Sequence, residues 1–309
     1  MEILRFNIHT PVVNQQRITA CIGYFDGLHK GHQELIEKVI TLAKKNHTTP
    51  ALITFDPDPW VVVKQLKHIS HITPMKHRQQ IGASLGIEKW IVLDFQKDMA
   101  QLNYQQFHEL VLETLNIDTL VCGYDFHYGY RGEGTVETLK QQSSFHVEVI
   151  DEISCQNEKI SSTRIERLIR EGNLEEVTAM MGRPLELRGT VKSGNRIGRK
   201  YGFPTANLKL EANYVLPKIG VYIGSVFVND EWHMSIINVG HNPSFNYQNN
   251  TSIEAFILDF SSMIYDKEVK YRFHHYLRGE KKFNNMDELK QQLENDTLSA
   301  RTYFENKGV

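Results

Sequence analysis

The stretch "GYFDGLHKGHQELI", Gly23 to Ile36, places two histidines in a turn between an apolar run and an amphipathic segment. The preceding run, "RITACIG", is short and apolar and ends in glycine, which predicts a buried strand. After the turn, apolar residues recur at helical spacing as far as Ala43, which predicts an α-helix. The first amides of a helix lack partners and its N-terminal dipole end is positive. The stretch therefore predicts an anion site at a strand-to-helix turn.

The rest of the first half repeats this alternation of strand and helix. The runs "ALITF", "KWIVLDF", "TLVCG" and "FHVEVI" have the composition of strands, while "MKHRQQIGASLG" and "YQQFHELVLETLN" have helical periodicity. Such alternation predicts a parallel α/β sheet covered on both faces. In sheets of this class, ligands bind beyond the carboxyl ends of the strands.

The second half is rich in strand-like runs instead of alternating strands and helices. The runs "ELRGTV", "GVYIGSVFV", "EWHMSIINVG", "SIEAFILDF" and "EVKYRFHHYL" are rich in strand formers, and Asn229-Asp230 between two of them is a hairpin signal. A helical pattern runs from about Met286 to Phe304. We predict a small antiparallel barrel or sandwich closed by a C-terminal helix. The 309 residues then divide into two domains, 1–183 and 184–309.

Composition narrows the class of protein. The formal net charge of -2 gives no global field to attract nucleic acid or an anionic membrane. Cys21, Cys122 and Cys155 are far apart and form no CxxC, which argues against a zinc motif, a redox motif or a disulfide framework. The N-terminus lacks the pattern of a signal peptide, and no apolar run approaches the ~20 residues of a membrane span. We expect a cytoplasmic protein with neither nucleic acid nor membrane as a partner, and leave weak self-association open.

The histidine turn has a chemistry of its own. It contains neither GxxxxGK[ST] nor GxGxxG, and offers imidazoles instead. His29 and His32 can donate hydrogen bonds to phosphate oxygens and offset charge in a phosphoryl-transfer transition state. Gly31 lets a phosphate approach the backbone. The alternatives are a helix-capping loop with two incidental histidines, or a zinc site, which lacks a third ligand spaced nearby.

Two further segments of the first half carry candidate binding residues. "ISSTRIERLI" places Ser162 and Thr163 at the start of another helix, where a well-capped helix is the plain alternative. In "GYDFHYGYRGEG", Asp125, Phe126 and Arg131 fall in a strand-end loop. An aromatic ring there can stack on a flat ligand, and an arginine can bind phosphate.

The segment "GTVKSGNRIGRKYGFPTANLKL" in the second half combines glycines and basic residues with two hard ligands. Gly194, Gly198 and Arg199 lie in its glycine-rich basic part, and Thr205 and Asn207 follow a proline. A hydroxyl and an amide oxygen suit Mg²⁺ bound with a nucleotide. The alternatives are a basic surface loop and a nucleic-acid patch, and the surrounding chain is not basic enough to favour the latter.

These motifs resemble those of known families. "GYFDGLHKGH" resembles the HxGH signature of the nucleotidyltransferase superfamily, and "ISSTRIERLI" its later signature. "GRKYGFPTAN", followed by "NVGHNPSF", "IEAFILDF" and "LRGEKKF", is similar to the riboflavin kinase landmarks in order. In this arrangement the chain resembles the bacterial bifunctional riboflavin kinase/FAD synthetase family from about Arg17 to Phe304. The resemblance implies a Rossmann-like nucleotidyltransferase domain followed by a kinase barrel.

The resemblance also implies two steps that use ATP as co-substrate and Mg²⁺ as cofactor. Riboflavin becomes FMN in the C-terminal domain with release of ADP, and FMN becomes FAD in the N-terminal domain with release of pyrophosphate. It assigns the ATP phosphates and adenylyl transfer to Gly23, Phe25, His29, Gly31, His32, Ser162 and Thr163; the nucleotide of the kinase half to Gly194, Gly198 and Arg199; Mg²⁺ to Thr205 and Asn207; the flavin to Asp125, Phe126, Arg131 and Arg278; and the general base on the ribityl 5′-hydroxyl to Glu254.

The sequence departs from the family pattern at four places. Asp58 stands in "TFDPDP" where many members have histidine, "VKSG" replaces VVHG, "NPSF" replaces NPTF, and "IYDKE" replaces a YG turn. The last three lie in the kinase half. Two alternative functions therefore stay open: an FMN adenylyltransferase with an impaired kinase domain, and a non-catalytic regulator that binds flavin or nucleotide. The strand around Glu254 predicts that this carboxylate shares a face with Phe256 and Leu258.

Overall fold

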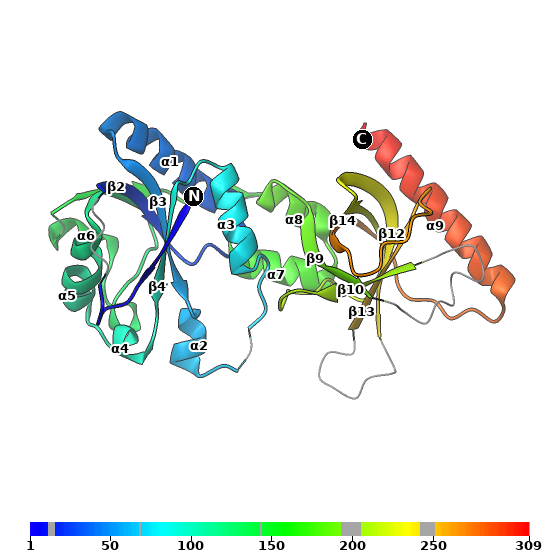
Figure 1. Ribbon diagram of the computed structural model, residues 1–309, viewed down its shortest axis with the longest axis horizontal. Helices are drawn as coiled ribbons and strands as arrows, with labels where there is room; N and C mark the ends of the chain where they lie inside the picture. Colours follow the sequence, from blue (N-terminus) through cyan, green and yellow to red (C-terminus); the bar gives the residue numbers. More distant parts are fainter. Residues whose placement is uncertain (12–15, 68, 143, 193–204, 242–250, 309) are drawn as a thin grey trace. The chain divides into compact units, whose positions relative to one another are not determined.

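The computed structural model describes residues 1–11, 16–67, 69–142, 144–192, 205–241 and 251–308. The chain divides into two compact units, Met1–Ser162 and Thr163–Val309 (Figure 1). Each unit has its own sheet and its own buried core.

The first unit is built on a six-stranded parallel sheet, which confirms the predicted α/β class. Its strands lie in the order β1-β4-β3-β2-β5-β6, and every neighbouring pair is parallel. The strands are β1 (Glu2–Phe6), β2 (Ile18–Ile22), β3 (Thr49–Asp56), β4 (Lys89–Asp94), β5 (Ile117–Gly123) and β6 (His146–Ile150). A small hairpin, β7 (Ser154–Cys155) and β8 (Glu158–Lys159), follows β6.

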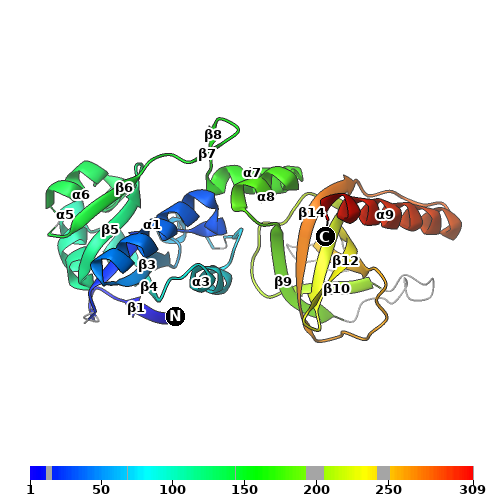
Figure 2. The same cartoon turned by 90° about the horizontal axis from the view of Figure 1, so that it is seen from above.

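Helices cover both faces of this sheet (Figures 1 and 2). On one face, α1 (Lys30–Asn46) and α3 (Met75–Ser84) pack apolar residues against Leu52 and Trp90. On the other face, α4 (Lys97–Ala100), α5 (Tyr104–Phe107) and α6 (Val136–Gln142) pack around Phe6 and Ile53. A further short helix, α2 (Pro59–Lys64), follows β3 and buries none of its residues.

The predicted helix over "YQQFHELVLETLN" does not continue as one α-helix. After α5 the chain forms a π-helical turn over His108–Leu112 and a 3₁₀ turn over Glu113–Leu115. His108 is buried, and its Nε2 lies 2.8 Å from Oε1 of Glu113, five residues later. A wider π turn brings residues five apart onto one face, which accounts for the change of helix type.

The second unit is a closed antiparallel barrel, one of the two architectures predicted for it. Its strands close in the order β10-β13-β12-β11-β14-β9. They are β9 (Leu185–Lys192), β10 (Thr205–Leu210), β11 (Gly220–Val228), β12 (Glu231–His241), β13 (Thr251–Ile257) and β14 (Glu268–Arg278). Asn229 and Asp230 both have positive φ, 54° and 66°, as the predicted two-residue hairpin requires.

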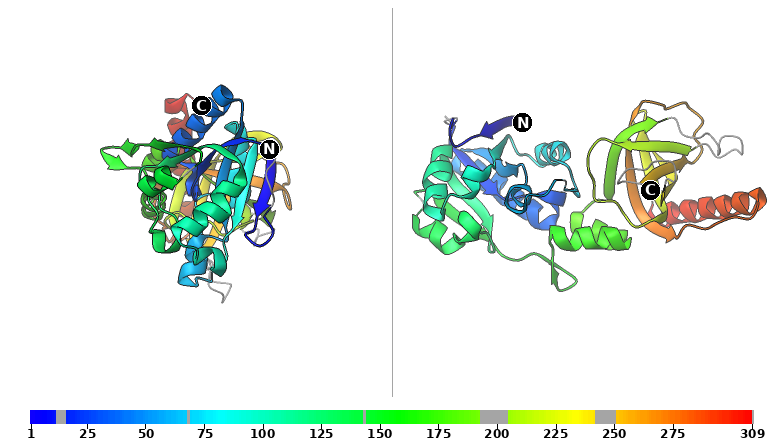
Figure 3. Two further views of the ribbon diagram at one scale, coloured as in Figure 1. Left: turned by 90° about the vertical axis from the view of Figure 1, so that its left-hand side faces the viewer. Right: turned by 90° about the horizontal axis from the view of Figure 1, so that it is seen from below.

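In the described part of the second unit the chain forms three helices. They are α7 (Ser162–Glu171), α8 (Leu174–Met181) and α9 (Met286–Lys307). The predicted C-terminal helix is confirmed: α9 lies along the outside of the barrel (Figure 3), where Ala300 and Phe304 pack with Val221 and Ile236. Among the described residues, none of the helices has the length and apolarity needed to cross a membrane.

Candidate active sites

A cavity of about 410 Å³ opens at the carboxyl ends of the parallel strands, where the sheet class predicts a ligand. Its lining comes from four segments that the sequence separates widely. These are the histidine turn after β2, the start of α2 after β3, the loop after β5, and the chain from the end of β6 to Ser162. Both His29 and His32 line it.

The two histidines form one compact unit at the start of α1. Their rings stack with centroids 3.7 Å apart and an interplanar angle of 17°. His29 is the N-cap of α1, and its Nδ1 accepts a hydrogen bond from the backbone N–H of His32 at 3.4 Å. Because Nδ1 accepts, the proton of a neutral His29 ring is on Nε2. The cap therefore orients a hydrogen-bond donor as well as starting the helix.

Neighbouring residues hold these rings in place. A Cβ at Gly31 would lie 3.2 Å from two atoms of the His29 ring, so a side chain there would press on the ring. Phe25 is fully buried and meets the His32 ring edge-to-face, with centroids 5.0 Å apart. Gly23, Phe25 and Gly31, all predicted phosphate-site residues, line the cavity.

Ser162 is tied directly to the histidine turn. Its hydroxyl donates to the carbonyl oxygen of Asp26 at 2.8 Å, across 136 residues of sequence. The buried carboxylate of Asp26 accepts from the backbone N–H groups of Gly27, Ile72 and Thr73, which joins a third segment to the turn. The adjacent predicted residue, Thr163, is the first residue of the second compact unit and is not among the described lining residues.

Lys159 is a lining residue that the sequence reasoning missed. Its ammonium forms an ion pair with Asp125 and lies 4.9 Å from the Tyr124 ring centroid. Partial burial alone would lower the pKa of Lys159, but hydrogen bonds to Asp125 and Tyr124 outweigh it and raise the pKa above its ordinary value. Lys159 is the one lysine or arginine among the described lining residues, beside three carboxylates. The sequence signal was its place just before "ISST".

The predicted flavin residues of this unit separate in space. Asp125 and Phe126 line the cavity, and Phe126 stacks on Tyr128 with centroids 5.8 Å apart. Arg131 is exposed, lies over the Tyr130 ring at 5.1 Å, and is not among the described lining residues.

A buried polar network lies behind the turn. Arg78, 1% exposed, donates to the carbonyl oxygens of Thr73 and Tyr24 and to Nδ1 of His71. An arginine can only donate, so His71 carries its neutral-form proton on Nε2, which lies 3.6 Å from Asp58. Burial, and then Arg78, lower the pKa of His71. Asp58 is itself buried, so the residue that departs from the family pattern belongs to this network.

In the barrel, Glu254 lies between two asparagines of the neighbouring strands. On β13 it is opposite Asn207 of β10 on one side and Asn238 of β12 on the other. Its Oε2 accepts a hydrogen bond from the Thr205 hydroxyl at 3.3 Å. The neighbours Ile253, Ala255 and Ile257 are buried, while Glu254 and Phe256 are half-buried, which confirms the predicted alternation over these positions.

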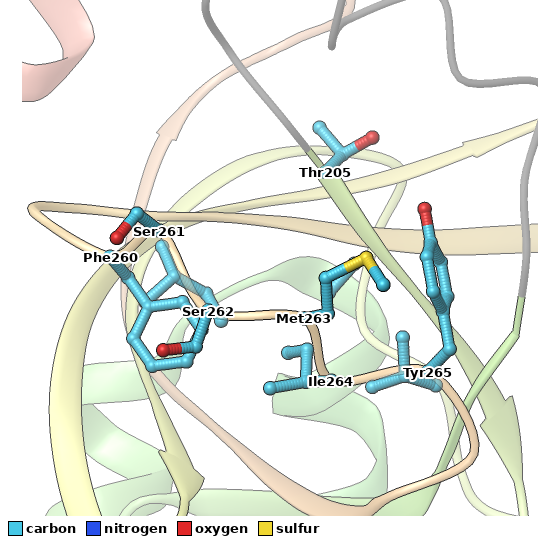
Figure 4. Close-up of a pocket in the computed structure, with 10 residues that line it drawn as sticks. Thr205, Phe260, Ser261, Ser262, Met263, Ile264 and Tyr265 are labelled. Carbon is cyan, nitrogen blue, oxygen red and sulfur yellow. The ribbon is translucent and has the colours of Figure 1, made fainter.

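Two hollows of the barrel unit meet at Thr205. One, of about 300 Å³, contains Glu254, Asn238 and Arg278 together with apolar side chains of α9. The other, of about 350 Å³, is lined by the loop 260–265 together with strand residues that include Thr205 (Figure 4). Figure 4 shows the Met263 and Tyr265 side chains on the same side of that loop as Thr205. Among the described residues, Asn207 lines neither hollow. Ala206, the residue before it in β10, lines the 350 Å³ hollow.

Arg278, a predicted flavin residue, is held by a buried carboxylate. Asp296 of α9 is 2% exposed and accepts from Nε of Arg278 at 3.1 Å and from an Nη atom at 2.7 Å. Gln292 donates to the same carboxylate at 2.9 Å. The ion pair joins α9 to β14 at the edge of the 300 Å³ hollow, and both partners line that hollow.

Three predicted nucleotide residues lie outside the described residues: Gly194, Gly198 and Arg199. The variant motif "NPSF" also lies outside them. Within the described ranges, no three histidine, cysteine, aspartate or glutamate residues form a group that could hold a metal ion.

Comparisons with known proteins identify both halves. The FAD synthetase family model matches residues 12–164, and the riboflavin kinase model matches residues 181–304. The bifunctional riboflavin kinase/FMN adenylyltransferase of Listeria monocytogenes is 35% identical over 304 residues, covering 96% of this chain and 97% of that protein. The enzyme of the same name from Bacillus subtilis is 33% identical, with 96% of each chain covered.

A solved structure is also similar over the whole chain. It is titled a macrolide-efflux protein from Streptococcus pneumoniae, is 31% identical, and superposes with a TM-score of 0.90 over 97% of this chain and 99% of that one. The sequence relatives, the two family models and this full-length match cover the same two halves. The chain belongs to the bifunctional riboflavin kinase/FMN adenylyltransferase family.

Proposed function

We propose that this chain makes FAD in two ATP-dependent steps, one in each unit. The barrel unit phosphorylates riboflavin to FMN, and the sheet unit transfers AMP from ATP to FMN and releases pyrophosphate. Both family models match, and full-length relatives carry the bifunctional name. The observation that carries the proposal is the pair of separate polar sites: stacked histidines at a helix start in one unit, and a carboxylate bonded to a hydroxyl in the other.

In the sheet unit, a phosphate oxygen of FMN attacks the α-phosphorus of ATP. A phosphorus–oxygen bond to FMN forms as the bond to the β-phosphate breaks, and pyrophosphate leaves. The Nε2–H of His29, fixed by the cap, and the adjacent His32 ring donate to the phosphate oxygens as charge develops. Ser162, whose hydroxyl is bonded to the histidine turn, binds the phosphates that leave.

Lys159 supplies the permanent positive charge of this cavity. The substrates bring several phosphate charges into a lining that already holds Asp125, Asp151 and Glu152. An ammonium that Asp125 positions at the wall offsets part of that charge. Asp125 therefore acts through Lys159 as well as on the substrate.

In the barrel unit, Glu254 accepts the proton of the ribityl 5′-hydroxyl of riboflavin. The resulting oxygen attacks the γ-phosphorus of ATP, and ADP leaves. Thr205 stands between the two hollows, so flavin in the 300 Å³ hollow and nucleotide in the 350 Å³ hollow meet there. Arg278, held by Asp296, forms part of the flavin wall.

Mg²⁺ fits the oxygen donors of the barrel site. Mg²⁺ in nucleotide sites binds one or two protein oxygens and completes its shell with phosphates and waters. Thr205 Oγ1, hydrogen-bonded to Glu254, and the amide of Asn207 in register with Glu254 provide donors of this kind. When bound, the ion would neutralise phosphate charge while these residues orient it.

We place the functional boundary at 183/184, within three residues of position 181, where the kinase model begins. The adenylyltransferase model ends at 164, so α8 lies between the two matches. The protein acts in the cytoplasm, where riboflavin, FMN and ATP meet. Self-association is not required by either step, because each proposed site draws on one unit.

The proposal is tested by incubating the pure protein with ATP, Mg²⁺ and either riboflavin or FMN, then separating the flavins by chromatography. We expect FMN and FAD from riboflavin, and FAD from FMN. Formation of FAD from FMN, without formation of FMN from riboflavin, would favour an adenylyltransferase with an impaired kinase domain. Tight flavin binding without turnover would favour a non-catalytic regulator.

A further inference from the structure

The backbone of the histidine turn is strained. Phe25 and Leu28 both have positive φ, 57° and 41°, and Gly27 between them has a φ of 78°. A residue with a Cβ rarely adopts this left-handed conformation, which glycine adopts freely. Both Phe25 and Leu28 are fully buried. Strained backbone of this kind persists only where the surrounding contacts hold it, so the turn needs a restraint from the rest of the unit.

Arg78 of α3 supplies one such restraint. The residue is 1% exposed, and each of its three guanidinium nitrogens has a partner. Nη1 donates to the carbonyl oxygen of Tyr24 at 2.8 Å, and Nε donates to that of Thr73 at 2.7 Å. Nη2 lies 3.1 Å from Nδ1 of His71. Tyr24 directly precedes Phe25 in the chain, so Arg78 fixes the carbonyl group at the entrance of the strained turn.

Asp26, inside the turn, supplies the opposing restraint. Its buried carboxylate accepts from the backbone N–H groups of Ile72 at 3.0 Å and Thr73 at 2.9 Å. Thr73 therefore donates to Asp26 through its N–H and accepts from Arg78 through its carbonyl oxygen. The turn and residues 71–73 are thus bonded to each other in both directions, and Arg78 contacts both segments.

These contacts differ from what helix packing alone requires. Burying a charge costs free energy unless its hydrogen bonds are satisfied, and an apolar side chain would pack α3 against the sheet without that cost. Two of the three acceptors of Arg78 are backbone carbonyl groups, one at the histidine turn and one in the segment bonded to it. The acceptors of Arg78 therefore indicate a role in the geometry of the turn.

The geometry of the turn decides where the His29 donor lies. His29 follows Leu28 directly and starts α1, with its ring fixed by the bond from the N–H of His32 to Nδ1. A different path through residues 25–28 would start α1 in a different place and move Nε2 away from the reacting phosphate. A displacement of about 1 Å in a catalytic group lowers the rate by about 100-fold.

We propose that Arg78 is a positioning residue for adenylyl transfer, which acts through His29 by holding the histidine turn in its strained conformation. This inference rests on the proposed adenylyltransferase function and adds the residue that maintains its geometry. Arg78 is not among the described residues that line the cavity, so its effect reaches the substrate through the turn. Because the His29 donor acts on charge that develops in the transition state, the effect belongs to kcat.

The first test measures kcat and KM for FAD formation from FMN. Arg78→Met should lower kcat by about 10- to 100-fold and leave the KM for ATP and for FMN close to wild type. Arg78→Lys keeps the charge and can still donate to one carbonyl group, so it should restore part of the rate. Riboflavin phosphorylation by the same samples is the internal reference and should not change.

Lys89→Met is the matched control for loss of a buried cation. Lys89 is 4% exposed, lies on β4 of the same unit, pairs with Glu2, and is not among the described lining residues. This variant should unfold at a lower denaturant concentration than wild type, while the folded protein keeps its kcat for FAD formation. An equal loss of kcat in Lys89→Met and Arg78→Met would mean that any buried cation serves, and would overturn the specific role of Arg78.

A double-mutant cycle tests whether Arg78 acts through His29. His29→Asn already lacks the Nε2 donor, so His29→Asn/Arg78→Met should form FAD about as slowly as His29→Asn alone. Two losses that multiply would overturn the proposal. Should Arg78→Met not fold, the same cycle is run with Arg78→Lys, and the same lack of additivity is expected.

The outcomes also separate this inference from the proposed function. Wild-type protein that forms no FAD from FMN would overturn the function itself. Wild-type protein that forms FAD, with Arg78→Met at the wild-type kcat, would overturn only the role of Arg78. A rise in the KM for ATP or FMN without a fall in kcat would place Arg78 in substrate binding and would also overturn it.

Discussion

At the scale of single residues, His29 combines two functions that the sequence presented as alternatives. Its Nδ1 caps α1 through the backbone N–H of His32, so a capping histidine is part of the structure. The same bond places the neutral-ring proton on Nε2, which suits a donor to phosphate. The cap and the phosphate site are therefore consistent with each other.

Lys159 gives a residue-scale prediction. Lys159→Met should raise the KM for ATP in FAD formation by about 10- to 100-fold, because it removes a charge-assisted hydrogen bond to phosphate. Lys159→Arg should retain most of the affinity. Steady-state assays of FAD formation at varied ATP measure the effect, with riboflavin phosphorylation as an internal reference that should not change.

Lys38→Met is the matched control for this charge. Lys38 is in the same unit, pairs with Glu148, and is not among the described lining residues. We expect its KM for ATP to remain near wild type. An equal rise for Lys38→Met and Lys159→Met would mean that only the general charge of the unit matters, and the specific role of Lys159 would fail.

Sequence reasoning found the residues that recur in motifs and missed those that act through position. His29 and His32 were found from their motif at a predicted strand-to-helix turn, and Glu254 from the resemblance of its strand to a riboflavin kinase landmark. Lys159 carries no periodic signal, and only the folded chain brings it to the cavity. Arg131 shows the converse: its loop was found, but Arg131 lies over the Tyr130 ring and is not among the described lining residues.

At the scale of elements, the strongly apolar strands and long helices were predictable and the short or atypical ones were not. β1 is five residues long and is mostly exposed at the edge of the sheet, so its sequence lacks a strand's alternation. β10 begins at Thr205 within a segment whose glycines and charges resemble a loop. Pairing with β9 and β13 makes it a strand, and that pairing is not encoded locally.

The ion pair between α9 and β14 gives an element-scale prediction. Asp296→Asn should lower the free energy of unfolding of the barrel unit by about 3 kcal/mol or more, because it leaves the largely buried Arg278 without its counter-charge. The KM for riboflavin should rise as well, since both residues line the 300 Å³ hollow in which we propose that the flavin binds. Denaturant unfolding and kinase assays measure the two effects.

An exposed pair on the same helix serves as the comparison. Arg301 of α9 pairs with Asp259, but their side chains are 39% and 70% exposed. Asp259→Asn should therefore cost no more than about 1 kcal/mol. The double variant Arg278→Met/Asp296→Asn should recover part of the loss, because no buried charge remains. Unfolding of Asp296→Asn at the wild-type denaturant concentration would contradict the buried-pair account.

At the scale of the whole molecule, two domains were predictable because alternating strand and helix patterns give way to consecutive strand patterns. Closure of the barrel was not predictable. The choice between a barrel and a sandwich depends on β9 pairing with both β10 and β14. That pairing joins residues far apart in sequence. The periodicity of each strand is the same in either architecture.

The second unit should function alone. Fragments 163–309 and 184–309 should both make FMN, and 184–309 should unfold at a lower denaturant concentration. The shorter fragment lacks α8, whose Leu174, Val177 and Met180 are fully buried and whose Glu175 pairs with His275 of β14. A soluble fragment 163–309 that binds ADP but never phosphorylates riboflavin, while the full chain does, would contradict an independent kinase unit.

The separation of two sites is tested most directly by measuring both half-reactions on two variants of the full chain. His29→Asn keeps a good N-cap but loses the Nε2 donor, and should lose FAD formation from FMN by roughly 100-fold or more while riboflavin phosphorylation continues at the wild-type rate. Glu254→Gln keeps the size of the side chain but not the proton acceptor, and should show the reverse pattern with a loss on the order of 100-fold. Loss of both activities in either variant, or of neither, would contradict the assignment of one reaction to each unit.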